Sequence, residues 1–309
     1  MYTDPTFDLT AIVVAYNSAA SIADTIDHIE SVLAPLSSEI LVVDNASIDQ
    51  TAEIAAKSLR YGRVIRSEQN LGFGGGINLG LQQAAGEFVL MLNDDVFPQP
   101  GSIEKMMAVF EDDTVGLAGA QMVNPDGSSS FAVRKHLPGL RDEVERIRDL
   151  LSGHHSRVEY PSGQWASEVG MLICACVLGR TDQLRALGGF NDAFFMYAED
   201  IDLCRRLTTS GYRLMTVPTA IAVHQREISP QRRPDRTEFA ERILDARNTY
   251  YRIWLSRPER VLVNLFRAIG PSDQPFRLRY HLTNAVWDGP SLRHLRQPVP
   301  IDPFHSGNT

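Results

Sequence analysis

The first third of the chain is dominated by short apolar runs that end abruptly in polar or acidic residues. The clearest run, residues 88–92, is followed by Asn93, Asp94 and Asp95. A segment that is apolar at every position is typical of a strand covered by helices on both faces, as in parallel sheets. Ligands bind such sheets at the carboxyl ends of the strands. The pattern therefore predicts two adjacent carboxylates at a ligand-binding edge.

Helical periodicity alternates with these strands. Further strands are expected at residues 9–17, 39–44 and 64–66, and helices from Ser21 or Asp24 to Pro35 and over residues 51–59. Strands and helices that alternate through short connections predict a right-handed, mostly parallel sheet of the nucleotide-binding type. The expected fold class is therefore α/β.

The α/β pattern continues with interruptions. It predicts a helix at residues 102–110, strands at 116–123 and 171–178, and edge strands at 214–217 and 220–223 that end at His224. Residues 131–165 form a long excursion with one amphipathic helix, 140–151. Such excursions in α/β domains often act as a lid or a substrate loop. Its His154 and His155 are expected to be solvated rather than to bind a ligand.

The charge is unevenly distributed over the 309 residues, whose composition is that of a globular protein. Residues 1–225 hold 16 basic and 29 acidic residues, a net charge of −13. Residues 226–300 hold 14 arginines and 8 acidic residues, a net charge of +6. The two parts should therefore face different partners. Nucleic-acid binding is not expected, because neither part carries a basic stripe with interleaved aromatic residues.

The cysteines and the hydropathy of the sequence indicate the cellular compartment in which the protein is expected. Cys174, Cys176 and Cys204 lack the spacing of a metal site and are interpreted as small, reduced core residues. We find no secretory leader, and the longest apolar run outside the first strands, near residues 171–178, is far shorter than the ~20 residues that span a bilayer. A cytoplasmic protein is expected.

The carboxylates at the strand ends are candidate ligand contacts. Asp94 and Asp95 would repel each other unless a cation lay beside them, and a hard divalent cation that also holds a diphosphate is one answer. The alternative is that they cap the turn before Pro98. Asp44, at the tip of the second strand, can accept hydrogen bonds from a base or a ribose, or it caps the following turn.

A glycine-rich stretch follows the third strand. It contains four glycines at positions 72, 74, 75 and 76, just ahead of a predicted helix. Such a turn lets the backbone approach a ligand, and a helix amino terminus favours an anion. The alternative is that the glycines serve tight packing alone. A dinucleotide fingerprint is disfavoured, because it should directly follow the first strand.

Three acidic residues cluster after the aromatic segment 194–197. They are Glu199, Asp200 and Asp202, and Asp200 is expected to open a helix. Asp200 at the helix start lies in the positive end of the dipole, which favours its ionised form, although Asp is also a common helix cap. Neighbouring helical positions diverge by ~100°, so Asp202 should face the helix exterior or Arg205 and Arg206. Glu199 is expected in the preceding loop.

These motifs together resemble the inverting family 2 glycosyltransferases of the GT-A fold, most closely their bacterial rhamnosyltransferase-like branch. The matching segments, in the family's order and covering about residues 8–226, are 14–17, 43–47, 70–72 with Asn78, 93–95, 188–206 and 222–224. The resemblance implies transfer of a sugar from a nucleoside diphosphate sugar, with Mg²⁺ or Mn²⁺ as cofactor.

The resemblance also implies roles for single residues. Asp44 would contact the donor base, Asp94 the donor diphosphate, Asp95 and His224 the metal, and Asp200 or Glu199 would be the catalytic base. The remaining donor contacts would be Ala15, Tyr16, Asn17, Arg66, Asn70, Gly72, Asn78 and Asn93, and the acceptor contacts Trp165, Phe195 and Glu199. Of the two carboxylates, we expect Asp200 to be the base.

Two departures from the family pattern are visible. Residues 173–175 read Ile-Cys-Ala where many relatives have Ser-Gly-Ala, and residues 179–180 read Gly-Arg where two arginines are common. Neither departure replaces an ionised group. Both therefore bear on the choice of sugar more than on activity.

We therefore expect the protein to catalyse a metal-dependent, inverting transfer of a sugar to a hydroxyl of a glycan or a lipid-linked acceptor in cell-surface polysaccharide synthesis. A thymine or uracil nucleotide, of the dTDP or UDP type, is expected as donor. One rival is another nucleotide enzyme, such as a sugar nucleotidyltransferase, which would need a basic glycine-rich loop after the first strand. A second rival is a non-catalytic protein that binds a nucleotide sugar.

The expected organisation is a catalytic domain at residues 1–228, with a donor half at about 8–125 and an acceptor half at about 126–228. Residues 229–309 would form a helical extension. Its arginines favour a peripheral contact with anionic lipids at the inner face of the membrane, and a solvated appendage or a homodimer surface is the alternative.

Overall fold

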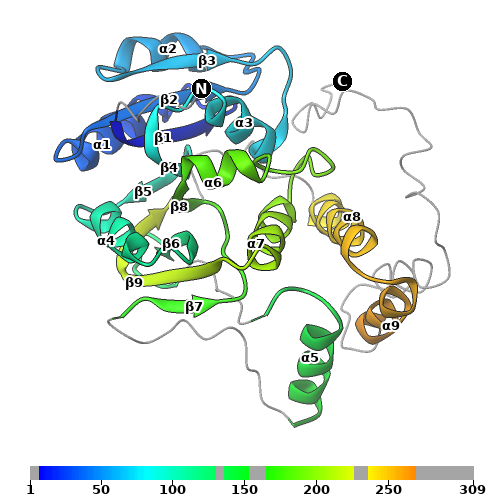
Figure 1. The fold of residues 1–309 in the computed structure, drawn as a ribbon. Coiled ribbons are helices and arrows are strands. Elements are labelled where there is room, and N and C mark those ends of the chain that lie inside the picture. The colour runs from blue at the N-terminus through cyan, green and yellow to red at the C-terminus, as the bar shows by residue number, and fades with distance from the viewer. Residues whose placement is uncertain (1–6, 130–135, 153–164, 226–235, 269–309) are drawn as a thin grey trace, which may run out of the picture. The chain divides into compact units, whose positions relative to one another are not determined.

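The computed structural model describes residues 7–129, 136–152, 165–225 and 236–268. The chain divides into two compact units (Figure 1). Unit 1 is formed by residues 1–135 and 158–228, and unit 2 by residues 136–157 and 229–309. His154 and His155 lie outside the described residues.

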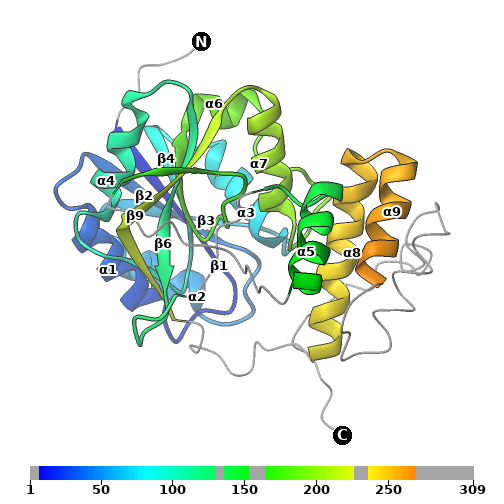
Figure 2. The ribbon, with the colours of Figure 1, turned by 90° about the horizontal axis from the view of Figure 1, so that it is seen from below.

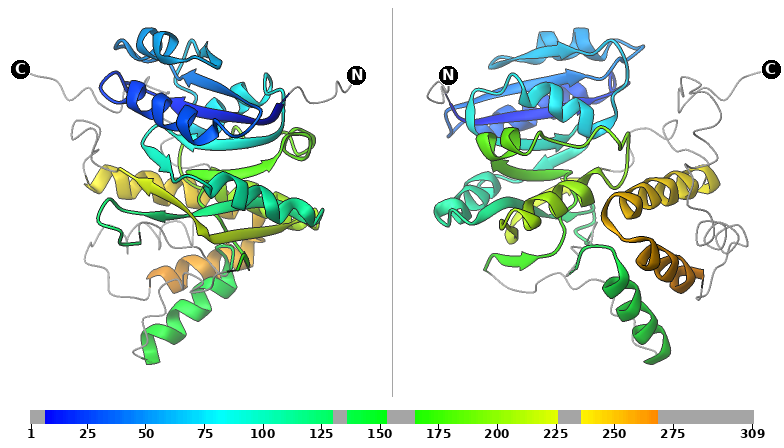
Figure 3. Two further views of the ribbon diagram at one scale, coloured as in Figure 1. Left: turned by 90° about the vertical axis from the view of Figure 1, so that its left-hand side faces the viewer. Right: turned by 45° about the vertical axis from the view of Figure 1, so that its right-hand side comes forward.

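Unit 1 contains one sheet. Its strands are β1 Phe7–Ala15, β2 Ser38–Asp44, β3 Gly62–Arg66, β4 Gly86–Asn93, β5 Val96–Pro98, β6 Val115–Val123, β7 Ser167–Val169, β8 Cys176–Arg180 and β9 Arg213–His224. Their order is β3-β2-β1-β4-β8-β6-β9-β5, with β7 also paired to β9. The first four strands are parallel, as the alternating pattern predicts, and β8 is antiparallel to both of its neighbours. The strands turn progressively across the sheet (Figure 3), the twist expected of L-residues.

Helices cover both faces of this sheet (Figure 2). Their bounds are α1 Ile22–Leu33, α2 Thr51–Ser58, α3 Gly72–Leu81, α4 Ser102–Ala108, α6 Thr181–Ala186 and α7 Glu199–Thr209, with a 3-10 turn at Val109–Glu111. Apolar residues of α1, α2 and α4 share one core with alternate residues of β1, β2 and β4. Helix α3 packs on the opposite face, where Gly76 and Gly80 lie against Val14 and Ile12 of β1. The core thus fixes the strand ends that carry the polar residues.

Four sequence predictions about local structure were wrong. The strand expected at 171–178 begins only at Cys176, because residues 174–175 form a turn. The two edge strands at 214–217 and 220–223 are one internal strand, β9, whose pairing with β6 shifts register between Ala120 and Gln121. Pro218, which lacks an amide hydrogen, lies at this irregularity, so it interrupts the pairing without ending the strand.

The other two errors concern helix starts. Gly74, Gly75 and Gly76 lie inside α3 rather than ahead of it. Helix α7 starts at Glu199, with Ala198 at the N-cap position, so Glu199 is helical rather than in the loop. Glycine is permitted in α3 because its missing side chain allows close packing, a gain that outweighs its low helix propensity.

Unit 2 is helical in its described part. It contains α5 Leu140–Ser152, α8 Arg236–Trp254 and α9 Arg257–Ala268. These three helices lie side by side (Figure 2). The buried Glu143 of α5 lies 3.6 Å from the guanidinium of Arg267 in α9. The same guanidinium donates to the hydroxyl of Tyr251 in α8 at 3.0 Å. The predicted helix in the 131–165 excursion thus packs with the C-terminal helices.

None of the helices in the described part of the chain combines the length and the apolar character needed to cross a bilayer.

Candidate functional site

The ends of β1, β2 and β4 bring several predicted site residues to one edge of the sheet. The register pairs Ala15 with Asp44 and Val14 with Asn93. Asp44 and Asn93 therefore flank the end of β1, about two strand spacings, or ~10 Å, apart. The carbonyl of Ala15 accepts the amide hydrogen of Asn45 at 2.9 Å, which holds the two loops together at this edge.

Asp44 is a buried carboxylate with unused hydrogen-bonding capacity. It is 5% exposed, and within the described residues its Oδ1 atom has no hydrogen-bond partner. Leaving such an atom buried without a donor costs free energy, so a site of this kind is suited to accept an N–H group from a ligand. Arg66 pairs with Asp44 in the register, but its guanidinium bonds to Glu53 at 2.6 Å.

The loops after β1 and β2 are interlocked. The amide of Asn17 donates to the Ser47 hydroxyl at 2.9 Å, and Asn17 Oδ1 accepts the amide hydrogen of Ile48 at 2.9 Å. Asn17 and Ala46 both adopt positive φ angles, 52° and 64°. Backbone strain of this kind persists where surrounding contacts impose it, and it is frequent at ligand sites. The amide of Tyr16 donates to the Ser18 hydroxyl at 3.2 Å, so hydrogen bonds fix the backbone of both Tyr16 and Asn17 at this edge.

Ser18 is a site residue that sequence reasoning missed. Its hydroxyl hydrogen-bonds to Oδ2 of Asp94, while the hydroxyl of Thr25 donates to the Asp94 carbonyl at 2.8 Å. These contacts orient Asp94 toward the loop after β1. The signal available in the sequence was the position of Ser18 directly after the Asn17 motif.

Asp95 and His224 form the candidate metal site. Strand β5 pairs with β9 so that Val96 lies opposite His224, and the amide of Gln225 donates to the Asp95 carbonyl at 2.9 Å. The Asp95 Oδ1 and His224 Nε2 atoms are therefore 3.2 Å apart. Two neighbouring ligands of an octahedral metal with bonds of about 2.1 Å are about 3 Å apart. The same separation is that of a direct ion pair or hydrogen bond between the two side chains. Among the described residues no group of three or more His, Cys, Asp or Glu side chains could hold a metal, so Asp95 and His224 would supply only part of the ligands of Mn²⁺ or Mg²⁺.

Asn45 is a second residue that sequence reasoning missed. Its Oδ1 accepts the amide hydrogen of Leu71 at 2.9 Å, and its Nδ2 donates to the Gly72 carbonyl at 3.0 Å and to Asn70 Oδ1 at 3.1 Å. The predicted donor contacts Asn70 and Gly72 are thus tied to the end of β2. Asn78, further along α3, uses both polar atoms of its amide on the backbone of Phe190.

Glu199 and Asp200 open helix α7. Glu199 is 7% exposed, whereas Asp200 is half-buried and its Oδ1 accepts the amide hydrogen of Ile201 at 2.8 Å. Burial, followed by the negative charge of Asp200, raises the pKa of Glu199 to about 8. Burial next to a second carboxyl group thus favours the protonated form of Glu199 near neutral pH.

The backbone that leads into this pair is strained. Tyr197 and Ala198 have consecutive positive φ angles of 67° and 65°, which non-glycine residues rarely adopt. Phe195 and Met196, just before them, are 44% and 38% exposed. Trp165 is 82% exposed and begins the segment that leads into β7. Of the predicted acceptor contacts, Phe195 and Trp165 are therefore accessible on the surface of unit 1, whereas Glu199 is buried.

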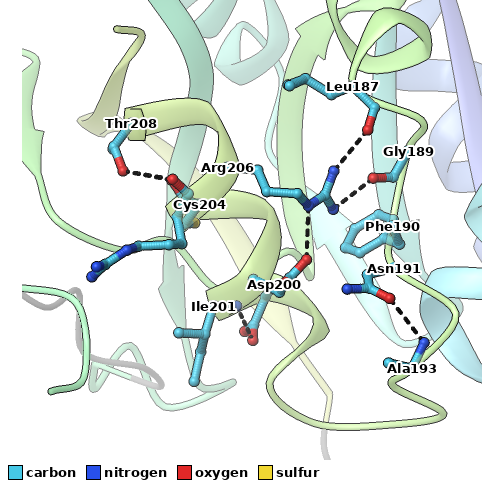
Figure 4. A network of polar contacts seen from close by, with 12 residues as sticks. Leu187, Gly189, Phe190, Asn191, Ala193, Asp200, Ile201, Cys204, Arg206 and Thr208 are labelled. Atoms are coloured by element: carbon cyan, nitrogen blue, oxygen red, sulfur yellow. Dashed lines mark hydrogen bonds and ion pairs between the residues drawn. The ribbon is translucent and has the colours of Figure 1, made fainter. Parts of the chain in front are cut away.

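Asp202 has a different environment from the other two acidic residues. It is fully buried and accepts a hydrogen bond from Arg206 Nε at 2.7 Å. Arg206 also donates to the carbonyls of Leu187 at 2.9 Å and Gly189 at 2.7 Å (Figure 4). The predicted contact between Asp202 and Arg206 is present, but Asp202 points into the protein rather than to the helix exterior. Sequence spacing could not show that two backbone carbonyls complete its ion pair.

The segment of residues 172–175, which contains the turn at 174–175, links strand β4 to helix α7. The amide of Asn93 donates to the Ala175 carbonyl at 3.2 Å, and the amide of Leu172 donates to Cys204 Sγ at 3.4 Å. Cys174, in the turn, is buried, and its pKa is raised well above the usual value, first by burial and then by Cys204, Asp200 and Glu199. The thiols of Cys176 and Cys204 are also buried, which raises the pKa of each to about 12. These cysteines are core residues, not nucleophiles.

Comparison with known proteins identifies the family. The model of a family described as glycosyl transferase family 2 matches residues 10–186. The chain is 30% identical over 239 residues to the N-acetylglucosaminyl-diphospho-decaprenol L-rhamnosyltransferase of Mycobacterium tuberculosis, which covers 67% of this chain and 75% of that protein. It is 26% identical over 140 residues to the rhamnosyltransferase WbbL of Escherichia coli, covering 45% and 52% of the two chains.

Structural comparison agrees. The mannosyltransferase PcManGT from Pyrobaculum calidifontis, solved with GDP-Man and Mn²⁺, superposes with a TM-score of 0.53 at 21% identity, over 92% of this chain and 72% of that chain. This likeness confirms the predicted GT-A fold. Because the family model spans more than half of the sequence and the rhamnosyltransferase relative matches over most of its length, the chain belongs to glycosyl transferase family 2 and is a glycosyltransferase.

Proposed function

We propose that the protein transfers a sugar, with rhamnose as the leading candidate, from a pyrimidine nucleoside diphosphate sugar to a hydroxyl of a lipid-linked or glycan acceptor. The reaction would be metal-dependent, would invert the anomeric carbon and would serve cell-surface polysaccharide synthesis. The observation that carries this proposal is the pair Asp95 and His224, whose ligand atoms lie 3.2 Å apart at the edge that also holds Asp44 and Asn93. The rhamnosyl assignment is supported by the named relatives.

The donor nucleotide would bind along the sheet edge. The Oδ1 atom of Asp44, which has no hydrogen-bond partner among the described residues, would accept the imide N–H of uracil or thymine, and the loop segment of Tyr16 and Asn17 would contact the nucleoside. Asp94, oriented by Ser18, lies next to Asp95 at the end of β4, where the diphosphate would lie. Guanine also offers N–H donors to a carboxylate, so a guanosine diphosphate sugar is the competing donor.

Asp95 and His224 would hold Mg²⁺ or Mn²⁺. When bound, such a metal neutralises the negative charge that develops on the leaving diphosphate. The arrangement of an oxygen and a nitrogen ligand at one strand end is the structural support for this cofactor.

Asp200 would accept the proton of the acceptor hydroxyl. It is the more exposed member of the carboxyl pair, and Glu199 holds a proton near neutral pH because its pKa is raised to about 8. A single displacement by the activated hydroxyl on the face opposite the diphosphate gives inversion. Glu199, together with the exposed Phe195 and Trp165, would bind the acceptor.

The catalytic domain would comprise residues 1–228 and the helical extension residues 229–309. A peripheral membrane contact of that extension would bring a lipid-linked acceptor to the enzyme, and its described helices contribute arginines such as Arg252 and Arg257.

A panel of nucleotide sugars, incubated with the protein, Mn²⁺ and a mixture of polyprenyl-linked glycans, tests the proposal. The expected result is release of thymidine or uridine diphosphate that is at least ~10-fold faster with acceptor than without it. Release of guanosine diphosphate alone would overturn the pyrimidine assignment. Formation of nucleoside triphosphate and sugar 1-phosphate when pyrophosphate is added, instead of nucleoside diphosphate release, would indicate a nucleotidyltransferase. Binding without any release would indicate a non-catalytic protein.

A further inference from the structure

The segment between α6 and α7, residues 187–198, is termed here the acceptor-side loop. It carries the exposed Phe195 and Met196 and ends at the strained residues Tyr197 and Ala198, directly before Glu199. The position of this loop therefore decides where the carboxyl pair and the acceptor contacts lie. Two side chains from outside the loop bind its first half through the backbone.

Arg206 provides the first anchor. Its guanidinium binds the carbonyls of Leu187 and Gly189 (Figure 4). The guanidinium is itself held by the buried carboxylate of Asp202. Because Arg206 belongs to α7, this anchor fixes the loop to the same helix that carries the catalytic pair. It does not connect the loop to the donor side.

Asn78 provides the second anchor, from the donor side. Asn78 Oδ1 accepts the amide hydrogen of Phe190 at 2.7 Å, and its Nδ2 donates to the Phe190 carbonyl at 2.8 Å. The amide thus pairs with the loop backbone as a neighbouring strand would. The fit depends on glycine, since a Cβ atom at Gly189, whose φ is +67°, would lie 2.2 Å from Asn78 Oδ1. Gly74 is also close-packed, because a Cβ atom there would lie 2.9 Å from the Phe190 side chain.

The amino-terminal end of α3 is fixed to the donor-base edge. Asn45, the residue after Asp44, binds the backbone of both Leu71 and Gly72. The loop contacts this end as well, because a Cβ atom on Gly72 would lie 1.6 Å from the Phe195 carbonyl oxygen. Helix α3 is therefore joined to the donor edge at one end and to the acceptor-side loop at Asn78 and Gly72.

We propose that Asn78 is a positioning residue, which holds the acceptor-side loop on α3 so that the donor-nucleotide site and the Glu199–Asp200 pair keep a fixed separation. The kinetic part of this inference rests on the function proposed above. Asn78 uses both its amide oxygen and its amide nitrogen on the backbone of Phe190, and this contact with the loop is the role proposed for it. This assigns Asn78 a different role from the donor contact that the family resemblance implies.

Hydrogen exchange of the nucleotide-free protein tests the anchor without reference to catalysis. In Asn78→Ala, amides of residues 187–198 should exchange about 10-fold faster or more, the size expected when two hydrogen bonds are lost. Peptides of β1 and β4 should keep their protection. Gln82→Ala is the matched control, because it removes an exposed amide from the end of the same helix. Unchanged exchange of the loop in Asn78→Ala would overturn the inference.

A variant on the loop side perturbs the same contact. Gly189→Ala introduces a methyl group where Asn78 Oδ1 lies and disfavours the positive φ, so it should accelerate loop exchange as Asn78→Ala does. The double variant should be little worse than either single variant, because both remove one contact. Fully additive effects of the two substitutions would contradict a shared anchor.

The kinetic arm separates positioning from donor binding. With Mn²⁺ present, the affinity of Asn78→Ala for thymidine or uridine diphosphate, measured by calorimetry, should stay within about 3-fold of wild type, while turnover falls about 10-fold or more. A loss of nucleotide affinity with unchanged loop exchange would identify Asn78 as a donor contact and refute the proposal. Absence of nucleotide binding by the wild type would instead refute the proposed function, and the exchange result would still decide whether Asn78 anchors the loop.

Discussion

Replacement of Glu199 by glutamine tests whether the carboxyl pair in α7 holds a proton near neutral pH. Glutamine keeps the shape and the burial of the side chain but cannot titrate. Wild-type Glu199 has a pKa of about 8 in the folded protein, against 4.5 for an ordinary glutamate, because it is buried beside the charged Asp200. Between these pH values the folded protein holds a proton that the unfolded chain has released. The stabilisation is therefore fully present below pH 4.5 and is lost as the pH rises to about 8.

The size of this effect follows from the two pKa values. The rise from 4.5 to about 8 spans about 3.5 pH units, and each unit corresponds to ~1.4 kcal/mol, so up to about 5 kcal/mol of stability would be lost over this range. At roughly 2 °C per kcal/mol for a domain of this size, the melting temperature of the wild type should fall by about 10 °C relative to the variant.

Thermal unfolding of both proteins at pH 5, 7 and 8.5 gives the comparison. The difference in Tm between Glu199→Gln and wild type should grow with pH, and the variant should be the more stable protein at pH 8.5. Other titrating groups affect both proteins equally and cancel in the difference. A difference in Tm that is constant with pH, or one that shrinks as the pH rises, would refute the assignment of the proton to Glu199.

Four other substitutions or measurements probe the remaining roles. Asp200→Asn should fold normally, because Asn is also favoured at helix starts, and should keep its nucleotide affinity. Its turnover should fall on the order of 10²-fold or more. Near-normal turnover of this variant, together with an inactive Glu199→Gln, would make Glu199 the base. Asp202→Asn should lower the free energy of unfolding by about 3 kcal/mol, because it leaves Arg206 without its buried partner. The pH profile of turnover should stay unchanged. A shifted profile would show that Asp202 takes part in proton transfer. His224→Ala should raise the Mn²⁺ concentration for half-maximal turnover about 10-fold or more, and an unchanged metal dependence would exclude it as a ligand. The full-length protein should co-sediment with anionic vesicles at low salt and not with neutral ones, and absence of co-sedimentation would leave the C-terminal helices as an appendage or a dimer surface.

Much of the sheet could be predicted, because each strand is marked by its own run of apolar residues. Strands β1, β2 and β4 are apolar at nearly every position, so both their course and the polar residues that follow them could be read from the sequence. Asp44 and Asp95 were placed at strand ends for this reason. His224 was placed at a strand end as well, but its partner Asp95 follows from the antiparallel pairing of β5 with β9, which the sequence does not show.

The wrong predictions concern segments whose secondary structure is determined by tertiary contacts. The glycines of α3 were interpreted as a turn ahead of a helix, whereas they are helical and allow Val14, Ile12 and Phe190 to approach the helix. The role of Asn78 depends on a loop far along the chain, so no local pattern could indicate it. Pro218 separated two apolar runs that the structure joins in one strand, because β6 pairs with β9 both before and after the irregularity.

Asp95 and His224 are proposed to hold a divalent metal through which the diphosphate of the donor binds. This is tested by calorimetric titration of uridine and thymidine diphosphate into the wild-type protein and into Asp95→Ala, each with Mn²⁺ and with EDTA. Mn²⁺ should strengthen nucleotide binding by at least ~10-fold in the wild type, and this gain should disappear in Asp95→Ala. Equal nucleotide affinity with Mn²⁺ and with EDTA, or a full gain retained by Asp95→Ala, would contradict it.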